Sequence, residues 1–363
     1  MVKAEIHSLT SLRGIAALWV ATTHLSMGIL NGYLPTFSEK TDFGLFTLMI
    51  GYGHYAVDFF FVLSGFIMCY AYKDKLTTHY SHKNLYNFYV ARFARLWPIT
   101  SFFSVLLFLL LMTGLWTSER DIGTANFIAS ITFFDLALGP DAAINEPAWS
   151  ISAEFFAYLL FPFFLIALKK DIKLPYLVIS ILGLSGLHIY IESLYGSDPQ
   201  TYSSYMLFRV SIEFLCGCLL YSISQKTDIS KYANPAFLSL LAVFLFFIIF
   251  FPLNFLILPL IPWLILFLAF TRKSVDKFMS AGFMVYLGKI SFSIYLVHYP
   301  FIELMEALCG DYLGTLDRTE DQFLIRLHLA GMLGAVTGLA ALCYHLIELP
   351  GRFFIKKRLS ITT

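Results

Sequence analysis

The feature that most constrains this chain is a series of ten apolar segments, each long enough to cross a lipid bilayer. A hydrocarbon core of about 30 Å requires roughly 20 residues of α-helix. The backbone must satisfy its own hydrogen bonds in lipid, so segments of this length are predicted to be helices. They lie near 12–31, 55–72, 96–115, 149–168, 175–191, 205–223, 236–251, 255–270, 283–308 and 324–347.

Composition supports a membrane protein rather than two soluble domains. The 363 residues are 58% hydrophobic and only 13% charged, whereas about a quarter of the residues in a soluble domain are charged. The 25 basic and 24 acidic residues leave no cationic surplus, so we expect no nucleic-acid partner. We therefore predict one all-α domain over 1–363, a polytopic helix bundle in the lipid bilayer without a separate soluble domain.

The segment 124–139 is apolar but contains Asp135, and we interpret it as a re-entrant or interfacial helix rather than as an eleventh span. The distribution of Lys and Arg supports an even number of spans. With ten spans, one side of the membrane holds 19 of these residues and the other holds Lys40, Arg120 and Arg318. Because cytoplasmic loops are rich in Lys and Arg, both termini are predicted to be cytoplasmic.

Ionisable side chains inside spans are costly there and are usually functional. On the predicted topology, four of them lie at similar depth in four different spans: His24, Asp58, Glu154 and His298. His24 has two interpretations, either a neutral imidazole bonded to a neighbouring helix or a general base that takes a hydroxyl proton near neutral pH. In the second case, Asp58 or Glu154 could fix its tautomer.

Two arginines lie at the predicted cytoplasmic edge. Arg92 and Arg95 are three residues apart and share one helix face. Neighbouring guanidiniums suit phosphate groups, although ordinary positive-inside anchors would have the same spacing. Arg209 and Glu213 are four residues apart and can simply pair with each other.

Seven motifs follow one another along the chain, and together they resemble a known family. They are the ten-residue spacing between Arg13 and His24, GHYAVDFFFVLSGF (53–66), ARFARLWP (91–98), WSISAEFFAYLLFP (149–162), FRVSIEFLCG (208–217), LGKISFSIYLVHYP (287–300) and YHLIELPGR (344–352). Each motif is weak by itself, but the ordered set is similar to the integral-membrane acyltransferase-3 family over nearly the whole chain.

The resemblance implies transfer of an acyl group, most often acetyl, from cytoplasmic acyl-CoA to a hydroxyl of an exported or surface glycan or a lipid-linked sugar. It implies a bacterial inner membrane and polysaccharide-assembly proteins as partners. It makes His24 the base, Glu154 an acidic residue of the outer site, and Arg13, Arg92 and Arg95 the contacts to acetyl-CoA. The family often has a second acidic residue after the glutamate, whereas Phe155 follows here, so a relay through a second carboxylate is not expected.

Further residues complete the predicted site. Asp58 joins the catalytic group because of its depth, and a pore or acceptor site is expected to involve Trp149, Ser152, Arg209, Lys289, Tyr295 and His298. Ser152 has the alternative interpretation of a hydroxyl that packs between helices. The chain ends at Thr363, shortly after the last apolar segment, so we expect no fused hydrolase-like domain.

Two other function classes remain open. A proton-coupled transporter or flippase of a glycan precursor would use buried His, Asp and Glu as a proton relay, and a multi-span sensor or scaffold is a third interpretation. The arginine pair and the absence of visible repeats favour the acyltransferase. The five cysteines are interpreted as small core residues, because Cys216 and Cys218 point away from each other on a helix, and no metal is expected.

Overall fold

The computed structural model describes residues 4–29, 51–118, 120–168, 172–195, 203–251, 253–316 and 322–360, which contain helices and no strand. Lys40, Arg318 and the basic residues at 169 and 170 lie outside the described residues. The longer helices are α1 (His7–Ile29), α3 (His54–Leu76), α4 (His82–Met112), α7 (Trp149–Ala167), α8 (Leu174–Tyr195), α9 (Ser203–Ser224), α10 (Ala233–Phe250), α14 (Gly282–Leu316) and α15 (Gln322–Cys343). Shorter ones are α5 (Thr124–Thr132), α6 (Asp135–Leu138), α11 (Asn254–Ile257), α12 (Leu260–Ala269), α13 (Lys273–Met279) and α16 (Leu349–Leu359).

The predicted all-α membrane bundle is confirmed. In the described ranges, seven helical segments are long and apolar enough to cross a membrane: His54–Leu76, His82–Met112, Glu146–Ala167, Leu174–Ile191, Tyr205–Ser224, Ala233–Phe250 and Arg326–Leu359. Asn254–Ala269 and Lys273–Met279 together form an eighth candidate, bent by 97°. These eight correspond to eight of the ten predicted segments. The remaining two predicted segments fall on α1 and α14. Ten crossings therefore remain a prediction.

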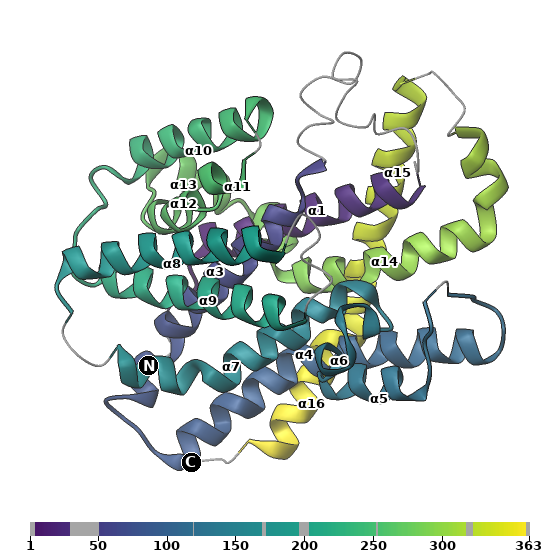
Figure 1. Ribbon diagram of the computed structural model, residues 1–363, viewed down its shortest axis with the longest axis horizontal. Coiled ribbons are helices and arrows are strands. Elements are labelled where there is room, and N and C mark those ends of the chain that lie inside the picture. Colours follow the sequence, from purple (N-terminus) through teal and green to yellow (C-terminus); the bar gives the residue numbers. More distant parts are fainter. Residues whose placement is uncertain are drawn as a thin grey trace.

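Burial separates central helices from lipid-facing ones. In the spans of α3 and α9, 72% of the residues are buried, against 22% for α8 and 17% for α10. A helix that is apolar all round and poorly covered by protein faces hydrocarbon in a membrane. Helices α7, α9 and α8 lie side by side across the left half of Figure 1, with α10 to α13 above them and α14 and α15 to the right. Helix α4 packs on α7 and runs from the lower left toward the right-hand side.

Two close crossings hold the central helices together. Helix α1 packs along α14, and a Cβ added at Gly288 of α14 would lie 1.9 Å from the Thr10 carbonyl oxygen of α1. Helix α3 packs along α9, where a Cβ at Gly65 would lie 1.9 Å from the Phe214 carbonyl oxygen. Glycine at these positions lets the backbones touch, which is how helices associate in lipid without a hydrophobic driving force.

The segment 124–139 forms two short helices, α5 and α6, separated by Phe133 with a left-handed φ of 64°. Nine residues of α5 rise only about 13 Å, so this segment is too short to cross the bilayer. Asp135, at the start of α6, is buried and accepts a hydrogen bond from the Ser152 hydroxyl of α7. This bond anchors the non-spanning segment against the bundle.

Candidate functional site

An open cavity of about 520 Å³ lies among α1, α3, α4, α7, α14 and α16. It is near the end of the bundle at which α1 and α14 begin and α16 ends, which we call the start face; the opposite end is the far face. Charged side chains from elements far apart in the sequence line the cavity: Glu5, Arg13, Arg92, Arg95, Glu154, Lys289 and Arg352.

The charge of this lining is unbalanced. Among the described residues, no carboxylate lies within 4.0 Å of the cationic groups of Arg13, Arg92, Lys289 or Arg352. Against these four cations, the lining contributes the carboxylates of Glu5 and Glu154, while Arg95 has a partner of its own. A cavity with a positive lining of this kind attracts an anionic ligand.

Arg92 is held by aromatic groups rather than by an acid. Its Nη2 donates to the Tyr72 hydroxyl at 3.0 Å, and the guanidinium lies over the rings of Tyr72 and Tyr158 at 5.1 and 5.7 Å. These contacts orient the guanidinium while leaving its charge uncompensated. A guanidinium held in this way can bind an anionic group such as a phosphate.

Glu154 organises the α7 wall of the cavity. Its Oε1 accepts hydrogen bonds from the Ser64 hydroxyl at 2.7 Å and from the Tyr158 hydroxyl, one helical turn away, at 2.5 Å. The two hydroxyl oxygens are 3.0 Å apart. Glu154 thus fixes Tyr158 beneath Arg92 and does not contact His24.

Arg95 forms an ion pair with Glu348, whose carboxylate is 1% exposed. Glu348 ends a π-helical turn, Tyr344–Glu348, and its Oε2 also accepts a hydrogen bond from the Ser293 hydroxyl at 2.7 Å. A π-turn inside a longer helix redirects side chains and often occurs at functional sites. Arg95 is thus 17% exposed and tied to the bundle, unlike a solvated positive-inside anchor.

His24 and His298 meet between α1 and α14. The Nδ1 atom of His24 lies 2.8 Å from Nε2 of His298. The ring of Tyr295 contacts that of His298 at 5.7 Å and also lines the cavity, and its hydroxyl lies 2.8 Å from that of Ser150. Tyr295 therefore separates the cavity from the histidine pair.

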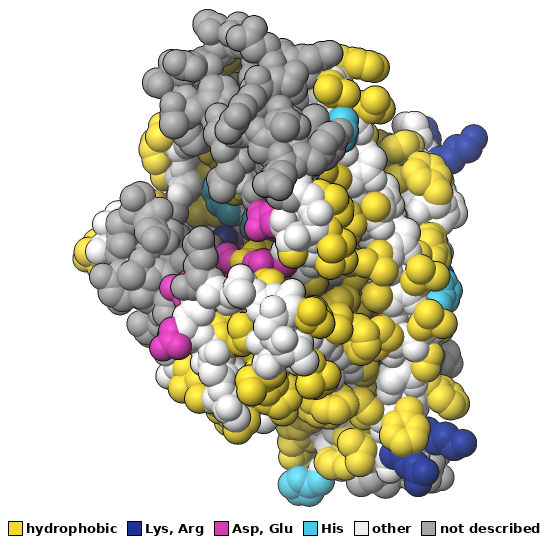
Figure 2. Space-filling model, turned by 90° about the vertical axis from the view of Figure 1, so that its right-hand side faces the viewer, with side chains coloured by type: hydrophobic (Ala, Val, Ile, Leu, Met, Phe, Trp, Pro, Cys, Tyr) yellow, Lys and Arg dark blue, Asp and Glu magenta, His cyan; other side chains and the backbone are white. Residues whose placement is uncertain are grey.

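Between the histidine pair and the far face of the bundle, acidic and aromatic groups lie close together. Glu146 is near enough to His24 and to Tyr299 to act on both electrostatically. The indole Nε1 of Trp116 donates to Glu303 at 2.7 Å. Figure 2 shows the face at the right of Figure 1, where acidic groups gather at a hollow with hydrophobic side chains to its right and below it.

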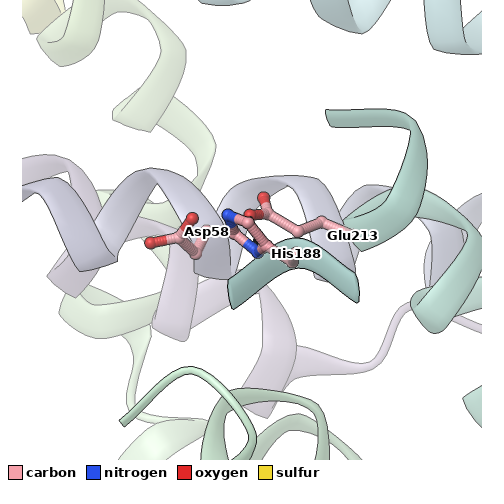
Figure 3. A group of neighbouring side chains, drawn as sticks. All are labelled: Asp58, His188 and Glu213. Carbon is pink, nitrogen blue, oxygen red and sulfur yellow. Dashed lines mark ion pairs between the residues drawn. The ribbon is translucent and has the colours of Figure 1, made fainter. Parts of the chain in front are cut away.

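A second polar cluster lies between α3, α8 and α9 (Figure 3). Arg209 donates to Asp58 Oδ1 through Nε at 2.9 Å and Nη2 at 2.6 Å, and its Nε lies 3.4 Å from Glu213 Oε1. His188 Nδ1 is 3.3 Å from the same glutamate oxygen. The adjoining space is about 20 Å³, which suits one water molecule at most. We call these four residues the Asp58 cluster.

The ligand atoms of Asp58, His188 and Glu213 lie within 4.8 Å of one another, a spacing that a metal ion could bridge. The Arg209 guanidinium already supplies positive charge to both carboxylates. The expected pairing of Arg209 with Glu213 is confirmed, with Asp58 as an additional partner. In contrast to the cavity, this cluster is closed and its cation contacts both carboxylates, with the second oxygen of Asp58 and of Glu213 left buried without a hydrogen-bond partner.

Comparison with known proteins identifies the protein family. A family model described as an acyltransferase domain, that of the acyltransferase-3 family, matches residues 6–345. The chain belongs to the acyltransferase-3 family. It is 25% identical over 340 residues to the acyltransferase MdmB of Streptomyces mycarofaciens, covering 85% of this chain and 82% of that relative. No solved structure matches it.

Membership in the acyltransferase-3 family makes the protein a membrane acyltransferase, and the geometry shows how the predicted site residues are distributed. The cavity unites Arg13, Arg92, Arg95, Glu154, Lys289 and Tyr295 from the prediction. His24 and His298 form a separate pair beyond Tyr295. Four other predicted residues lie outside the lining. Ser152 bonds Asp135 and Trp149 packs on Phe61, while Asp58 and Arg209 belong to the Asp58 cluster.

The structure corrects one expectation. Neither Asp58 nor Glu154 fixes the tautomer of His24, because Asp58 is bonded to Arg209 and Glu154 to Ser64 and Tyr158, while His298 meets the His24 ring. Similar depth in the membrane did not mean lateral contact.

Sequence reasoning also missed several members of the site: Ser64, Tyr72, Tyr158, Glu348 and Arg352. The spacing of Tyr158, four residues after Glu154, was a usable signal for one of them.

Proposed function

We propose that the protein transfers an acyl group, most simply acetyl, from acyl-CoA to a hydroxyl of an exported or surface glycan or a lipid-linked sugar. The observation that carries this proposal is the juxtaposition of a cavity rich in unpaired cations with a histidine pair behind Tyr295. The first feature suits a polyanionic donor, and the second suits removal of a hydroxyl proton. The family match supports the acyl-transfer chemistry.

The donor's phosphates would bind at the start face, where Arg13, Arg92 and Arg352 line the cavity. Guanidinium groups engage phosphate oxygens in pairs, and those of Arg13 and Arg92 each have a buried Nε without a hydrogen-bond partner. Among the described residues these are the orphaned nitrogens of the cavity lining. Acyl-CoA in this position requires the start face to be cytoplasmic, as the Lys and Arg distribution predicts.

The pantetheine arm would then extend past Tyr295 toward the histidine pair. His24 takes the proton of the acceptor hydroxyl, and the resulting oxygen attacks the thioester carbonyl carbon. The C–S bond breaks as the C–O bond forms, and the proton on His24 returns to the departing sulfur, giving the ester and free CoA thiol. Glu154 keeps Tyr158 and Ser64 in place on the donor side.

The acceptor would approach from the far face. There the Glu303 carboxylate accepts a hydrogen bond from the Trp116 indole, and Glu146 lies near Tyr299. Such carboxylates can also accept from sugar hydroxyls. A glycan or lipid-linked sugar exported across a bacterial inner membrane would reach this side, and polysaccharide-assembly proteins are the partners expected to deliver it.

The test compares transfer with donor binding in purified protein. His24→Gln keeps a polar side chain but cannot take up a proton, so acylation of the acceptor should fall about 10²- to 10⁴-fold. Binding of acyl-CoA should be unchanged, because His24 does not line the cavity. Transfer by His24→Gln near the normal rate would refute the assignment of the base. Failure of the wild-type protein to bind acyl-CoA would instead favour the transporter alternative.

A further inference from the structure

The two histidine rings are joined edge to edge. Their planes differ by 10°, and the ring centroids lie 5.0 Å apart. Nδ1 of His24 and Nε2 of His298 are 2.8 Å apart, and each nitrogen lies on the rim of its own ring. Adding the two distances from ring centroid to nitrogen to this 2.8 Å gives nearly the full separation of the centroids, so the two nitrogens lie close to the line that joins the centroids. The hydrogen bond therefore lies nearly in the plane of both rings, where the lone pair and the N–H bond of an imidazole point. One of the two nitrogens donates and the other accepts.

The backbone of α14 decides which nitrogen donates. Nδ1 of His298 lies 3.3 Å from the carbonyl oxygen of Ile294, one helical turn earlier. A carbonyl can only accept, so this Nδ1 carries the proton of the neutral ring and Nε2 of His298 carries none. His24 must then donate from Nδ1, and its own Nε2 is left with a free lone pair.

We propose that His298 is a positioning residue that fixes His24 in the tautomer protonated on Nδ1, so that Nε2 of His24 receives the acceptor's proton. The proposal rests on the proposed function, in which His24 is the base. Burial assigns the two roles: His298 is fully buried, with 0% of its surface exposed, whereas His24 is partly exposed. His24 can therefore reach an acceptor, and His298 acts through it.

The same arrangement stabilises the charged state that forms during transfer. When Nε2 of His24 takes the proton, Nδ1 still donates to the neutral Nε2 of His298, so the bond becomes charge-assisted and stronger. The electrostatic attraction of Glu146 acts in the same direction. The edge contact with Tyr295 holds the His298 ring in place. His298 thus replaces the carboxylate that orients the histidine in many catalytic triads.

The first experiment compares two amides at position 298. The carboxamide of Gln reaches the place of Nε2 and can accept from His24, whereas that of Asn ends near the place of Nδ1. His298→Asn should lower kcat about 10- to 100-fold, the range for loss of a group that orients another ligand or base. KM for acyl-CoA should change little, and His298→Gln should keep most of kcat. Equal kcat values for the two variants would contradict the proposal.

The second experiment fixes the tautomer chemically. His298→Ala leaves His24 free to protonate on either nitrogen and leaves room beside its Nδ1. Replacing His24 by Nδ1-methylhistidine in that background forces the lone pair of the neutral ring onto Nε2. Transfer should then be faster than with ordinary histidine in the same His298→Ala background, and replacement by Nε2-methylhistidine should abolish it.

The proteins with ordinary histidine and with Nδ1-methylhistidine at position 24 share the His298→Ala change, so a folding defect caused by that change would affect them equally. Acyl-CoA binding reports whether each is folded. No gain with Nδ1-methylhistidine would overturn the proposed tautomer. The result also separates the two proposals. An active His24→Gln refutes the base itself, whereas an inactive His24→Gln with fully active His298→Asn refutes the role of His298 alone.

Discussion

Two groups of ionisable side chains lie inside this bundle, and they are built in opposite ways. Around the cavity, Arg13, Arg92, Lys289 and Arg352 lack a carboxylate partner in the described chain and border about 520 Å³ of open space. In the Asp58 cluster, Arg209 contacts two carboxylates and the adjoining space is about 20 Å³. Charge inside a membrane span therefore does not identify a binding site by itself. Uncompensated charge beside open volume is the stronger indication of one.

The largest effect is expected from breaking the closed cluster. Arg209→Met would leave Asp58 and Glu213 buried without their cation, and removing one partner of a buried ion pair costs about 3–5 kcal/mol of unfolding free energy. Chemical denaturation in detergent micelles measures this loss. The matched control is Arg92→Met, on the cavity wall, which strands no carboxylate and should cost less than half as much. Equal losses would erase the contrast between the two regions.

A triple variant sharpens the same comparison. Replacing Asp58, Arg209 and Glu213 together by Leu, Met and Leu should recover most of the stability lost by Arg209→Met, since apolar replacement of a whole buried ion network is often neutral. Acyl-CoA binding should persist, because these residues do not line the cavity. Loss of donor binding in a stable triple variant would show that the cluster is part of the donor site.

Among the described residues, Arg95 is the one cavity arginine with an acidic partner within 4.0 Å, so it combines features of both regions. Arg95→Ala should cost about 3 kcal/mol of unfolding free energy, because the Glu348 carboxylate stays buried and unpaired. Adding Glu348→Gln should recover part of that loss, as measured by denaturation. A stability unchanged by Arg95→Ala, with weaker acyl-CoA binding, would place Arg95 with the unpaired donor contacts instead.

Arg92 should affect binding more than stability. Arg92→Ala should raise the Kd for acyl-CoA about tenfold, equivalent to about 1.4 kcal/mol. Arg92→Lys should recover only part of the affinity, because it lacks the planar fork that engages phosphate oxygens. Isothermal titration in micelles gives both values, with Arg272→Ala, exposed and outside the cavity lining, as the control. An unaltered Kd would return Arg92 to the role of a positive-inside anchor.

The smallest effect is expected from Lys289, an exposed side chain at the cavity. Lys289→Ala should raise the Kd for acyl-CoA by a factor of about two to five at low salt, since exposed charges contribute little and are screened by ions. Repeating the titration at high salt should remove the difference. A salt-independent loss would mean that Lys289 makes a desolvated contact with the donor.

The sequence by itself determined the class of fold and the family. Long apolar segments can only become helices in lipid, which is why the predicted segments fall on helices, and nine residues of α5 are too few to cross. Helical periodicity also correctly placed Arg209 beside Glu213. The ordered motifs identified the acyltransferase-3 family before any contact was known.

Only the tertiary structure decided which ionisable groups meet. Sequence position sets the depth of a residue along the membrane normal, but not the rotation of its helix or the helix beside it. Asp58 and His24 are predicted at similar depth, yet α3 directs Asp58 toward Arg209 of α9, whereas the close packing of α1 on α14 brings His24 to His298, 274 residues away. Lateral partners follow from how side-chain shapes fit between helices, and that fit is a property of the whole bundle.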